Sequence, residues 1–337
     1  VSAFLNSNES AYGPSPAAVA AASAALAGME RYLENPDSIL APVIAARFGL
    51  RADRITTGLG SDDLLARLAR AYLGPGTELI RSANGYLKVP NYAYANDAEV
   101  VSVPDDSFKP SVDRMIAAMN GRTRIVYLAN PENPAGTYLS GAEVRRLHAA
   151  MPDTSLLVID NAYDEYVDAP DYESAHKLVE EAENVVMCRT LSKIFGLAGA
   201  RVGWAYGPPD VIDSLRRIAV TFPLASSSVA AAVAALEDED HTAFVRDANR
   251  ADRNWFSVEL TKMGLEVVPS QANFVLVKFP DPAKTAEAAD AALRDSGIAV
   301  RRFPSAAYRD YIRITVGRTD ELRACLAGIR TFLGGQT

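Results

Sequence analysis

Residues 184–201 read NVVMCRTLSKIFGLAGAR and join an apolar run to a cluster of hydroxyl and basic side chains. The apolar half is typical of a strand that is buried on both faces of a parallel sheet. Thr190, Ser192 and Lys193 come at the carboxyl end of that strand, and Arg201 follows eight residues after Lys193. Because open α/β sheets bind ligands beyond the carboxyl ends of their strands, this stretch predicts both a fold class and a candidate site. A solvated loop lysine is the alternative interpretation of Lys193.

The chain around this stretch alternates short apolar runs with helical patterns from about residue 55 to residue 207. Further strand-like runs occupy residues 77–83, 98–104, 122–130, 155–163 and 201–207. Helical patterns occupy residues 61–73, 111–119, 140–151 and 209–220. This alternation predicts an α/β, doubly wound domain with a mostly parallel sheet.

The alternation breaks at both ends of the chain. An alanine-rich helical stretch runs from about residue 227 to residue 263, and shorter strand and helix patterns follow it. We therefore expect a large domain over residues 31–220 and a smaller α+β domain over residues 221–337. Residues 1–30 do not fit the strand–helix rhythm, and we expect them to form an arm that packs with the small domain.

Composition excludes several classes of protein. The chain has 337 residues, and 34 Lys and Arg against 42 Asp and Glu give a net charge of −8, which disfavours binding to nucleic acid. Two cysteines far apart, Cys188 and Cys325, indicate neither a disulfide framework nor a metal site. No apolar run approaches the ~18 residues of a membrane span. No signal peptide is visible, so we expect a cytoplasmic protein, although the start at Val1 leaves a missing upstream segment open.

Other polar residues follow the remaining predicted strands. Asn130 and Asn133 belong to a turn-rich NPENPAG segment, Asp160 and Tyr163 end the next run, and GLGSDD (residues 58–63) opens a helix. Free amides at a helix N-terminus suit a phosphate group. A carboxylate can pair with a protonated ring nitrogen, and a desolvated lysine can form a Schiff base. Each feature alone is also compatible with plain capping or turn chemistry. Together they are the parts that hold pyridoxal 5'-phosphate.

Three segments resemble the fold-type I aminotransferases of classes I and II. They are SKIFGLAGARVGW (residues 192–204), NPENPAG (residues 130–136) and DNAY (residues 160–163), and they occur in the order typical of that family. The resemblance covers nearly the whole chain. It implies a large domain with a mostly parallel seven-stranded sheet, pyridoxal 5'-phosphate as cofactor, and a homodimer that acts on a small amino donor and a keto acid acceptor.

The resemblance also assigns roles to individual residues. Lys193 would be the Schiff-base lysine that moves the proton, and Asp160 would pair with the pyridine nitrogen. Asn133 and Tyr163 would face the ring 3'-oxygen, and Tyr86 would stack on the ring. The cofactor phosphate would be bound by Gly60, Ser61, Asp62, Thr190, Ser192 and Arg201, together with Tyr32 from the partner subunit. The substrate would be bound by Asn8, by Arg301 through its phosphate and by Arg313 through its carboxylate.

The resemblance also implies a substrate, on the evidence of segments near both ends of the chain. Segments such as LNSNES (residues 5–10) and YIRITVG (residues 311–317) favour transamination between glutamate and histidinol phosphate. An aromatic amino acid as substrate, or decarboxylation of a phosphorylated amino acid, stays open. A binding protein without activity is disfavoured because Lys193 and Asp160 are both present.

Departures from the family pattern fall mainly at the substrate end. RYLENPDS (residues 31–38) and NGYLKVP (residues 84–90) differ from the usual segments, whereas Ala135 and Asn161 replace no catalytic group. Because side chains alternate along a strand, we expect only one of Arg301 and Arg302 to face the site, and the resemblance implies that it is Arg301.

Overall fold

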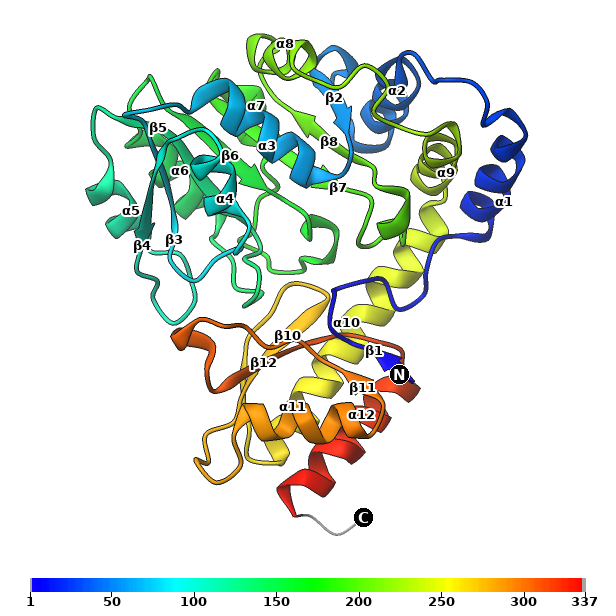
Figure 1. The fold of residues 1–337 in the computed structure, drawn as a ribbon, viewed down its shortest axis with the longest axis vertical. Coiled ribbons are helices and arrows are strands. Elements are labelled where there is room, and N and C mark those ends of the chain that lie inside the picture. Colours follow the sequence, from blue (N-terminus) through cyan, green and yellow to red (C-terminus); the bar gives the residue numbers. More distant parts are fainter. Residues whose placement is uncertain (1, 335–337) are drawn as a thin grey trace.

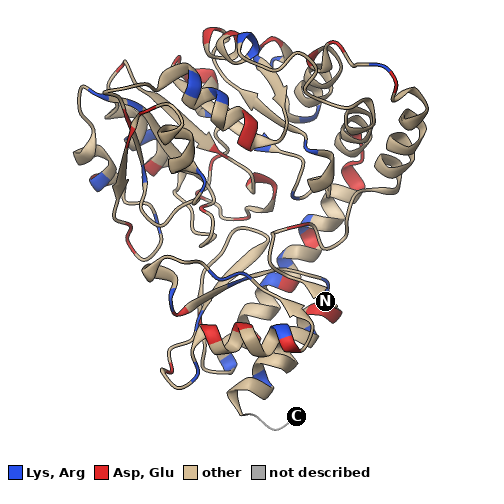
Figure 2. Cartoon of the chain, viewed as in Figure 1, with Lys and Arg blue, Asp and Glu red and all other residues tan. Residues whose placement is uncertain are grey.

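The computed structural model describes residues 2–334, which form two bodies joined by the long helix α10 (Glu239–Lys262) (Figure 1). We call the body around the seven-stranded sheet the large domain and the body around the three-stranded sheet the small domain. Figure 2 shows Lys and Arg interspersed with Asp and Glu over both bodies. Within residues 2–334, no helix combines the length and the apolarity needed to cross a membrane.

The large sheet has the strand order β2-β8-β7-β6-β5-β3-β4. Its strands are β2 (Ile55–Gly58), β3 (Glu78–Ser82), β4 (Glu99–Val103), β5 (Thr123–Ala129), β6 (Leu156–Asp160), β7 (Val185–Thr190) and β8 (Gly203–Tyr206). Strand β8 runs antiparallel to its neighbours β2 and β7. The other four pairings, β7-β6, β6-β5, β5-β3 and β3-β4, are parallel. The predicted α/β fold with a mostly parallel sheet is thus confirmed.

The continuous apolar runs are explained by two cores, one on each face of this sheet. In β5, Val126 and Leu128 belong to one core, whereas Ile125 and Tyr127 belong to the other. Strand alternation sends successive side chains to opposite faces, so a strand covered on both sides must be apolar throughout. The covering helices are α2 (Pro36–Phe48), α3 (Ser61–Tyr72), α4 (Val89–Tyr94), α5 (Val112–Ala118), α6 (Gly141–Ala149), α7 (His176–Glu181) and α8 (Pro209–Arg217).

The small domain packs helices against an antiparallel sheet of order β12-β10-β9. Its further elements are β9 (Glu266–Val268), β10 (Phe274–Lys278), α11 (Ala286–Asp295), β11 (Ile298–Ala299), β12 (Tyr311–Thr315) and α12 (Thr319–Leu333). The N-terminal strand β1 (Ala3–Phe4) pairs in parallel with β11, and Leu5 lies in the small-domain core. The first residues of the chain therefore pack with the small domain.

The expected boundary at residue 220 does not coincide with the packing. Helix α9 (Ser226–Glu237) contributes Val229 and Leu236 to the core of the large domain, and Val245 of α10 joins them. Helix α1 (Pro16–Ala25) lies beside α9, and its Ala18 is buried in the same core (Figure 1). Alanine-rich helices carry a weak amphipathic pattern, so their sequence does not reveal which core they join. We propose that the change of domain falls within α10.

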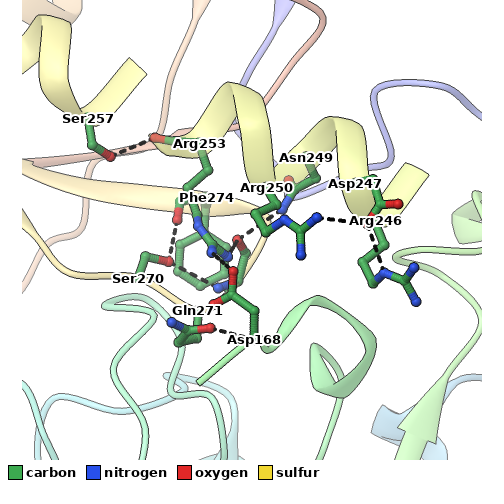
Figure 3. Close-up of polar contacts among 11 residues, drawn as sticks. Asp168, Arg246, Asp247, Asn249, Arg250, Arg253, Ser257, Ser270, Gln271 and Phe274 are labelled. Carbon is green, nitrogen blue, oxygen red and sulfur yellow. Dashed lines mark hydrogen bonds and ion pairs between the residues drawn. The ribbon is translucent and has the colours of Figure 1, made fainter. Parts of the chain in front are cut away.

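Polar contacts fix the two domains against each other on one side (Figure 3). Arg253 of α10 is 3% exposed, donates to the backbone oxygen of Ala272 at 3.2 Å, and pairs with Asp168 of the large domain at 3.4 Å. The Asp168 amide donates to the side chain of Gln271 at 2.9 Å. The Gln271 amide in turn donates to the Gly136 oxygen at 2.8 Å, which docks the NPENPAG loop on the small domain.

Candidate active site

A cavity of about 250 Å³ lies at the carboxyl ends of β5, β6 and β7, beside the start of α3. Its wall contains most of the side chains expected to hold a cofactor. They are Ser61, Asp62, Tyr86, Asn133, Asp160, Tyr163, Thr190, Ser192, Lys193 and Arg201. Residues from six separate segments of the sequence therefore meet where an open α/β sheet binds its ligands.

One end of this cavity is built from backbone amides, hydroxyl groups and a guanidinium. Helix α3 begins at Ser61, directly after Gly60, which has φ of 81°. This positive φ favours glycine, and a Cβ atom at Gly60 would also lie 2.6 Å from an Arg201 nitrogen and displace the guanidinium. Arg201 donates to Ser192 at 3.3 Å, and the Thr190 hydroxyl donates to the same oxygen at 2.9 Å. Amides at a helix N-terminus together with these donors suit a phosphate dianion.

The side chain of Asp62 has a different partner from the one that the resemblance implied. Its carboxylate accepts hydrogen bonds from Tyr86 at 3.1 Å and from Tyr92 at 2.6 Å. Asp62 therefore orients the ring of Tyr86 with its side chain, and its backbone amide, in the first turn of α3, is the group that suits the phosphate. Sequence reasoning missed Tyr92, which lies on α4, thirty residues from Asp62.

Asp160 lies at the other end of the cavity and is 7% exposed. Its carboxylate accepts hydrogen bonds from the Tyr127 hydroxyl at 3.0 Å and from the Ala162 amide at 3.2 Å. Burial raises the pKa of Asp160 to about 6, although the Tyr127 hydrogen bond opposes this shift. Tyr127 was missed from the sequence. The sequence did contain one indication of it. Tyr127 lies on β5 two residues before Ala129, and Ala129 is the residue that pairs with Asp160 of β6.

Lys193 lies between the phosphate end and the substrate side of the site. Its ammonium group donates to the Ser7 oxygen at 3.4 Å and lies 5.8 Å from the centre of the Tyr163 ring. Burial, followed by the charge of Arg313, lowers the pKa of Lys193 to about 8. Tyr163 accepts a hydrogen bond from Asn8 at 3.0 Å, and burial raises the pKa of Tyr163 to about 12.

A second cavity of about 440 Å³ adjoins the first and extends toward the small domain. The two share Ser7, Tyr86, Asn133, Tyr163 and Lys193. Arg313 of β12 is 5% exposed, and it donates to the Asn133 side chain at 2.7 Å and to the Asn6 oxygen at 2.8 Å. Burial lowers the pKa of Arg313 to about 10.

Both members of the Arg301–Arg302 pair line this second cavity. The Arg302 guanidinium lies 3.7 Å from Glu287, and that Arg301 is the residue that faces the substrate stays a prediction. Strand β11 ends at Ala299, and Arg301 forms only an isolated bridge with Arg313, so strict strand alternation no longer applies at Arg302. Arg301 donates from Nε to the Asn6 oxygen at 3.2 Å and is otherwise exposed.

Tyr32 lines neither cavity of its own chain. It is 77% exposed, and its ring stacks on Phe222 with centroids 4.3 Å apart. The structure therefore brings the predicted cofactor residues together except for Gly60, which shapes the cradle from behind Ser61, and Tyr32.

The residues present fit pyridoxal phosphate. A phosphate cradle at a helix N-terminus, a buried carboxylate and a lysine with a depressed pKa open into one cavity. The fold and the site together define a pyridoxal-phosphate-dependent enzyme of fold type I.

The chain belongs to the family of class I and II aminotransferases, which it matches over residues 4–329. The family expected from the three motifs is thus confirmed. Over 331 residues the chain is 44% identical to histidinol-phosphate aminotransferase of Paramagnetospirillum magneticum. This alignment covers 98% of this chain and 91% of that protein. The enzyme of the same name from Ruegeria pomeroyi is 44% identical, over 97% of this chain and 90% of that protein.

A solved structure shows the same fold. Histidinol-phosphate aminotransferase from Sinorhizobium meliloti, in complex with pyridoxal-5'-phosphate, superposes with a TM-score of 0.94 at 29% identity. The superposition covers 99% of this chain and 91% of that one.

Proposed function

We propose that this chain is a pyridoxal-phosphate-dependent aminotransferase that exchanges an amino group between glutamate and histidinol phosphate in histidine biosynthesis. The two relatives named histidinol-phosphate aminotransferase, which align with nearly the whole of this chain, support histidinol phosphate as the substrate. The observation that carries the proposal is the position of Lys193, which lines both the cofactor cavity and the cation-rich cavity beside it. A group held in the first cavity and an anionic substrate held in the second would meet at this amine.

The cofactor would be held by residues already placed in the first cavity. Its phosphate would lie against the amides of α3, the hydroxyls of Thr190 and Ser192, and Arg201. Asp160 would face the ring nitrogen, and Asn133 and Tyr163 would face the ring 3'-oxygen, with Tyr86 stacked on the ring. When bound, the cofactor supplies an electron sink for negative charge at the substrate carbon.

The chain's own residues provide binding and proton transfer. Lys193, with a pKa of about 8, suits a base that removes the proton from the amino-bearing carbon of the substrate near neutral pH. Asp160, with a pKa of about 6, is ionised at pH 7 and stabilises a proton on a nitrogen that it faces. Arg313 would bind the carboxylate of glutamate, and Arg301 the phosphate of histidinol phosphate.

The pKa of Lys193 predicts how the apoenzyme captures its cofactor. Attack on an aldehyde needs the neutral amine, and a pKa of about 8 leaves about one amine in ten neutral at pH 7. We expect the capture rate constant to rise about tenfold per pH unit up to pH 8 and then level off. Stopped-flow absorbance measures this rate, and a rise that continues to pH 10 would indicate an unshifted lysine.

Arg301→Ala tests the substrate assignment. Loss of a hydrogen bond to a charged group costs about 1.5–3 kcal/mol, and because Arg301 is exposed we expect the lower end, about a 10-fold fall in kcat/KM for histidinol phosphate. The glutamate half-reaction should change less, because glutamate carries no phosphate. The matched control is Arg294→Ala on the outer face of α11, where the side chain is 71% exposed.

Equal losses for the two substrates, or no loss for either, would count against histidinol phosphate and favour an aromatic amino acid. Inorganic phosphate provides a second discriminator. It should compete with the amino donor if the donor is phosphorylated and should leave an aromatic donor unaffected.

We also propose a homodimer in which Tyr32 serves the partner subunit's cofactor phosphate. Tyr32 and its stacking partner Phe222 are exposed, and so are Leu26 and Met29, which precede Tyr32 in the sequence, and Val220, which precedes Phe222. Exposed apolar side chains of this kind, five of them within two short segments, favour association with a second copy. Sedimentation should therefore show a dimer, and a fully active monomer would contradict the proposal.

Mixed dimers test the exchange of Tyr32 between subunits. Lys193→Ala and Tyr32→Ala subunits, unfolded and refolded together, should regain up to about a quarter of wild-type activity, because a mixed dimer then holds one complete site. If Tyr32 served its own subunit, no complete site would form and mixing would restore nothing.

A further inference from the structure

The cavity proposed for the substrate carries more positive charge than Arg301 and Arg313 supply. Its wall also contains Lys88 and Arg302, in addition to Lys193. Among the described residues that line this cavity, none is Asp or Glu. Five cationic side chains around a space of about 440 Å³ form a site for a strongly anionic ligand.

These cations are poorly neutralised by the protein itself. The Nε atoms of Arg302 and Arg313 are buried and have no hydrogen-bond partner. The nearest carboxylate to Arg302 is Glu287 at 3.7 Å, on an exposed side chain. Within residues 2–334, Lys88 makes no ion pair with a carboxylate and no side-chain hydrogen bond. Arg301 and Lys88 are exposed and form no ion pair with a carboxylate among residues 2–334, so their charges are available to an anion that a ligand brings.

Lys88 differs from the arginines in the domain that carries it. Arg301, Arg302 and Arg313 come from the small domain, whereas Lys88 immediately precedes α4 of the large domain. It follows Tyr86 by two residues, and Asp62 anchors the Tyr86 hydroxyl at 3.1 Å. The backbone that bears Lys88 is therefore held in place beside the cofactor cavity, while its side chain stays exposed.

We propose that Lys88 is a specificity-determining residue that binds the substrate phosphate from the large domain, opposite the arginines of the small domain. This inference rests on the function proposed above. A phosphate group presents two charges and several acceptor oxygens, so it can engage cations from both domains at once. An uncharged hydroxyl at the same place attracts a lysine much less. Lys88 would therefore favour a phosphorylated amine over its dephosphorylated form.

The test compares Lys88→Met and Lys88→Arg holoenzymes with wild type. The first readout is the Kd of inorganic phosphate, measured by calorimetry on the holoenzyme. The second is kcat/KM for histidinol phosphate and for histidinol. We expect Lys88→Met to weaken phosphate and to lower kcat/KM for histidinol phosphate by about 5- to 10-fold, between the values for an exposed ion pair and a charged hydrogen bond.

The remaining expectations follow from charge. Histidinol turnover should stay unchanged in Lys88→Met, and Lys88→Arg should restore phosphate binding because it keeps the positive charge. Lys262→Met, at an exposed position on α10, is the matched control and should behave as wild type.

Each other outcome overturns the inference in a recognisable way. If Lys88→Met binds phosphate as wild type does while Arg301→Ala binds it weakly, Lys88 has no role and the proposed function stands. If Lys88→Met loses histidinol and histidinol phosphate equally, Lys88 acts on the fold of the loop and not on the phosphate. If wild-type holoenzyme does not bind phosphate, the inference and the proposed substrate both fail.

Discussion

Replacing Lys193 by alanine is expected to abolish transamination, with a fall in kcat of at least about 10⁴-fold, the upper range for loss of a general acid–base group. Lys193 is the only lysine that lines the cofactor cavity among the described residues, so no second lysine is placed to substitute for it. Burial lowers its pKa to about 8, which makes it a usable base near neutral pH. Single-turnover kinetics with glutamate measure the loss.

Two further measurements separate a chemical role of Lys193 from a structural one. Borohydride reduction of the wild-type holoenzyme should fix the cofactor on Lys193, as read by peptide mass. The Lys193→Ala protein should still bind cofactor non-covalently, because the phosphate cradle of α3, Ser192 and Arg201 is untouched. Lys177→Ala, where the side chain is 58% exposed, is the control. A label on another lysine would refute the assignment.

Asp160→Asn is expected to lower kcat/KM by about 150- to 5,000-fold, because removing one partner of a buried charge pair costs about 3–5 kcal/mol. The substitution keeps the shape of the side chain. Its oxygen can still accept from the Ala162 amide in place of Oδ1, and its NH2 group, in place of Oδ2, can donate to the Tyr127 hydroxyl oxygen. What it removes is the negative charge that would face the ring nitrogen of the cofactor. Steady-state kinetics with both substrates should show the loss equally.

Stability should not account for the loss in Asp160→Asn. The folded-state pKa of Asp160, about 6, lies above the ordinary value of 3.8, so folding favours the protonated, neutral carboxyl. Its contribution to stability is greatest below pH 4 and declines as the pH rises toward 6. At pH 7 the neutral amide should therefore leave the Tm of the apoenzyme equal or higher. Asp153→Asn, at an exposed position before β6, is the control, and a variant as active as wild type would refute the role of Asp160.

Local patterns in the amino-acid sequence were sufficient to predict the fold class and most of the residues that line the cofactor cavity. Apolar runs such as residues 184–190 must be covered on both faces, and that requirement leads to a parallel sheet with helices on each side. Topology then brings the carboxyl ends of β5, β6 and β7 to one edge, so Asn133, Asp160 and Lys193 can be placed together without coordinates. These features depend on local patterns of a few residues, which a single sequence displays.

Contacts between segments that are distant in the chain became apparent only in the folded structure. Asp62 meets Tyr86 and Tyr92, Tyr127 meets Asp160, and α9 joins the large domain rather than the small one. The substrate end depends on the docking of two domains, because Lys88 comes from one of them and Arg302 from the other. Strand register, the ends of strands and the docking of domains depend on many weak packing contacts added together. A local pattern of a few residues does not contain that information.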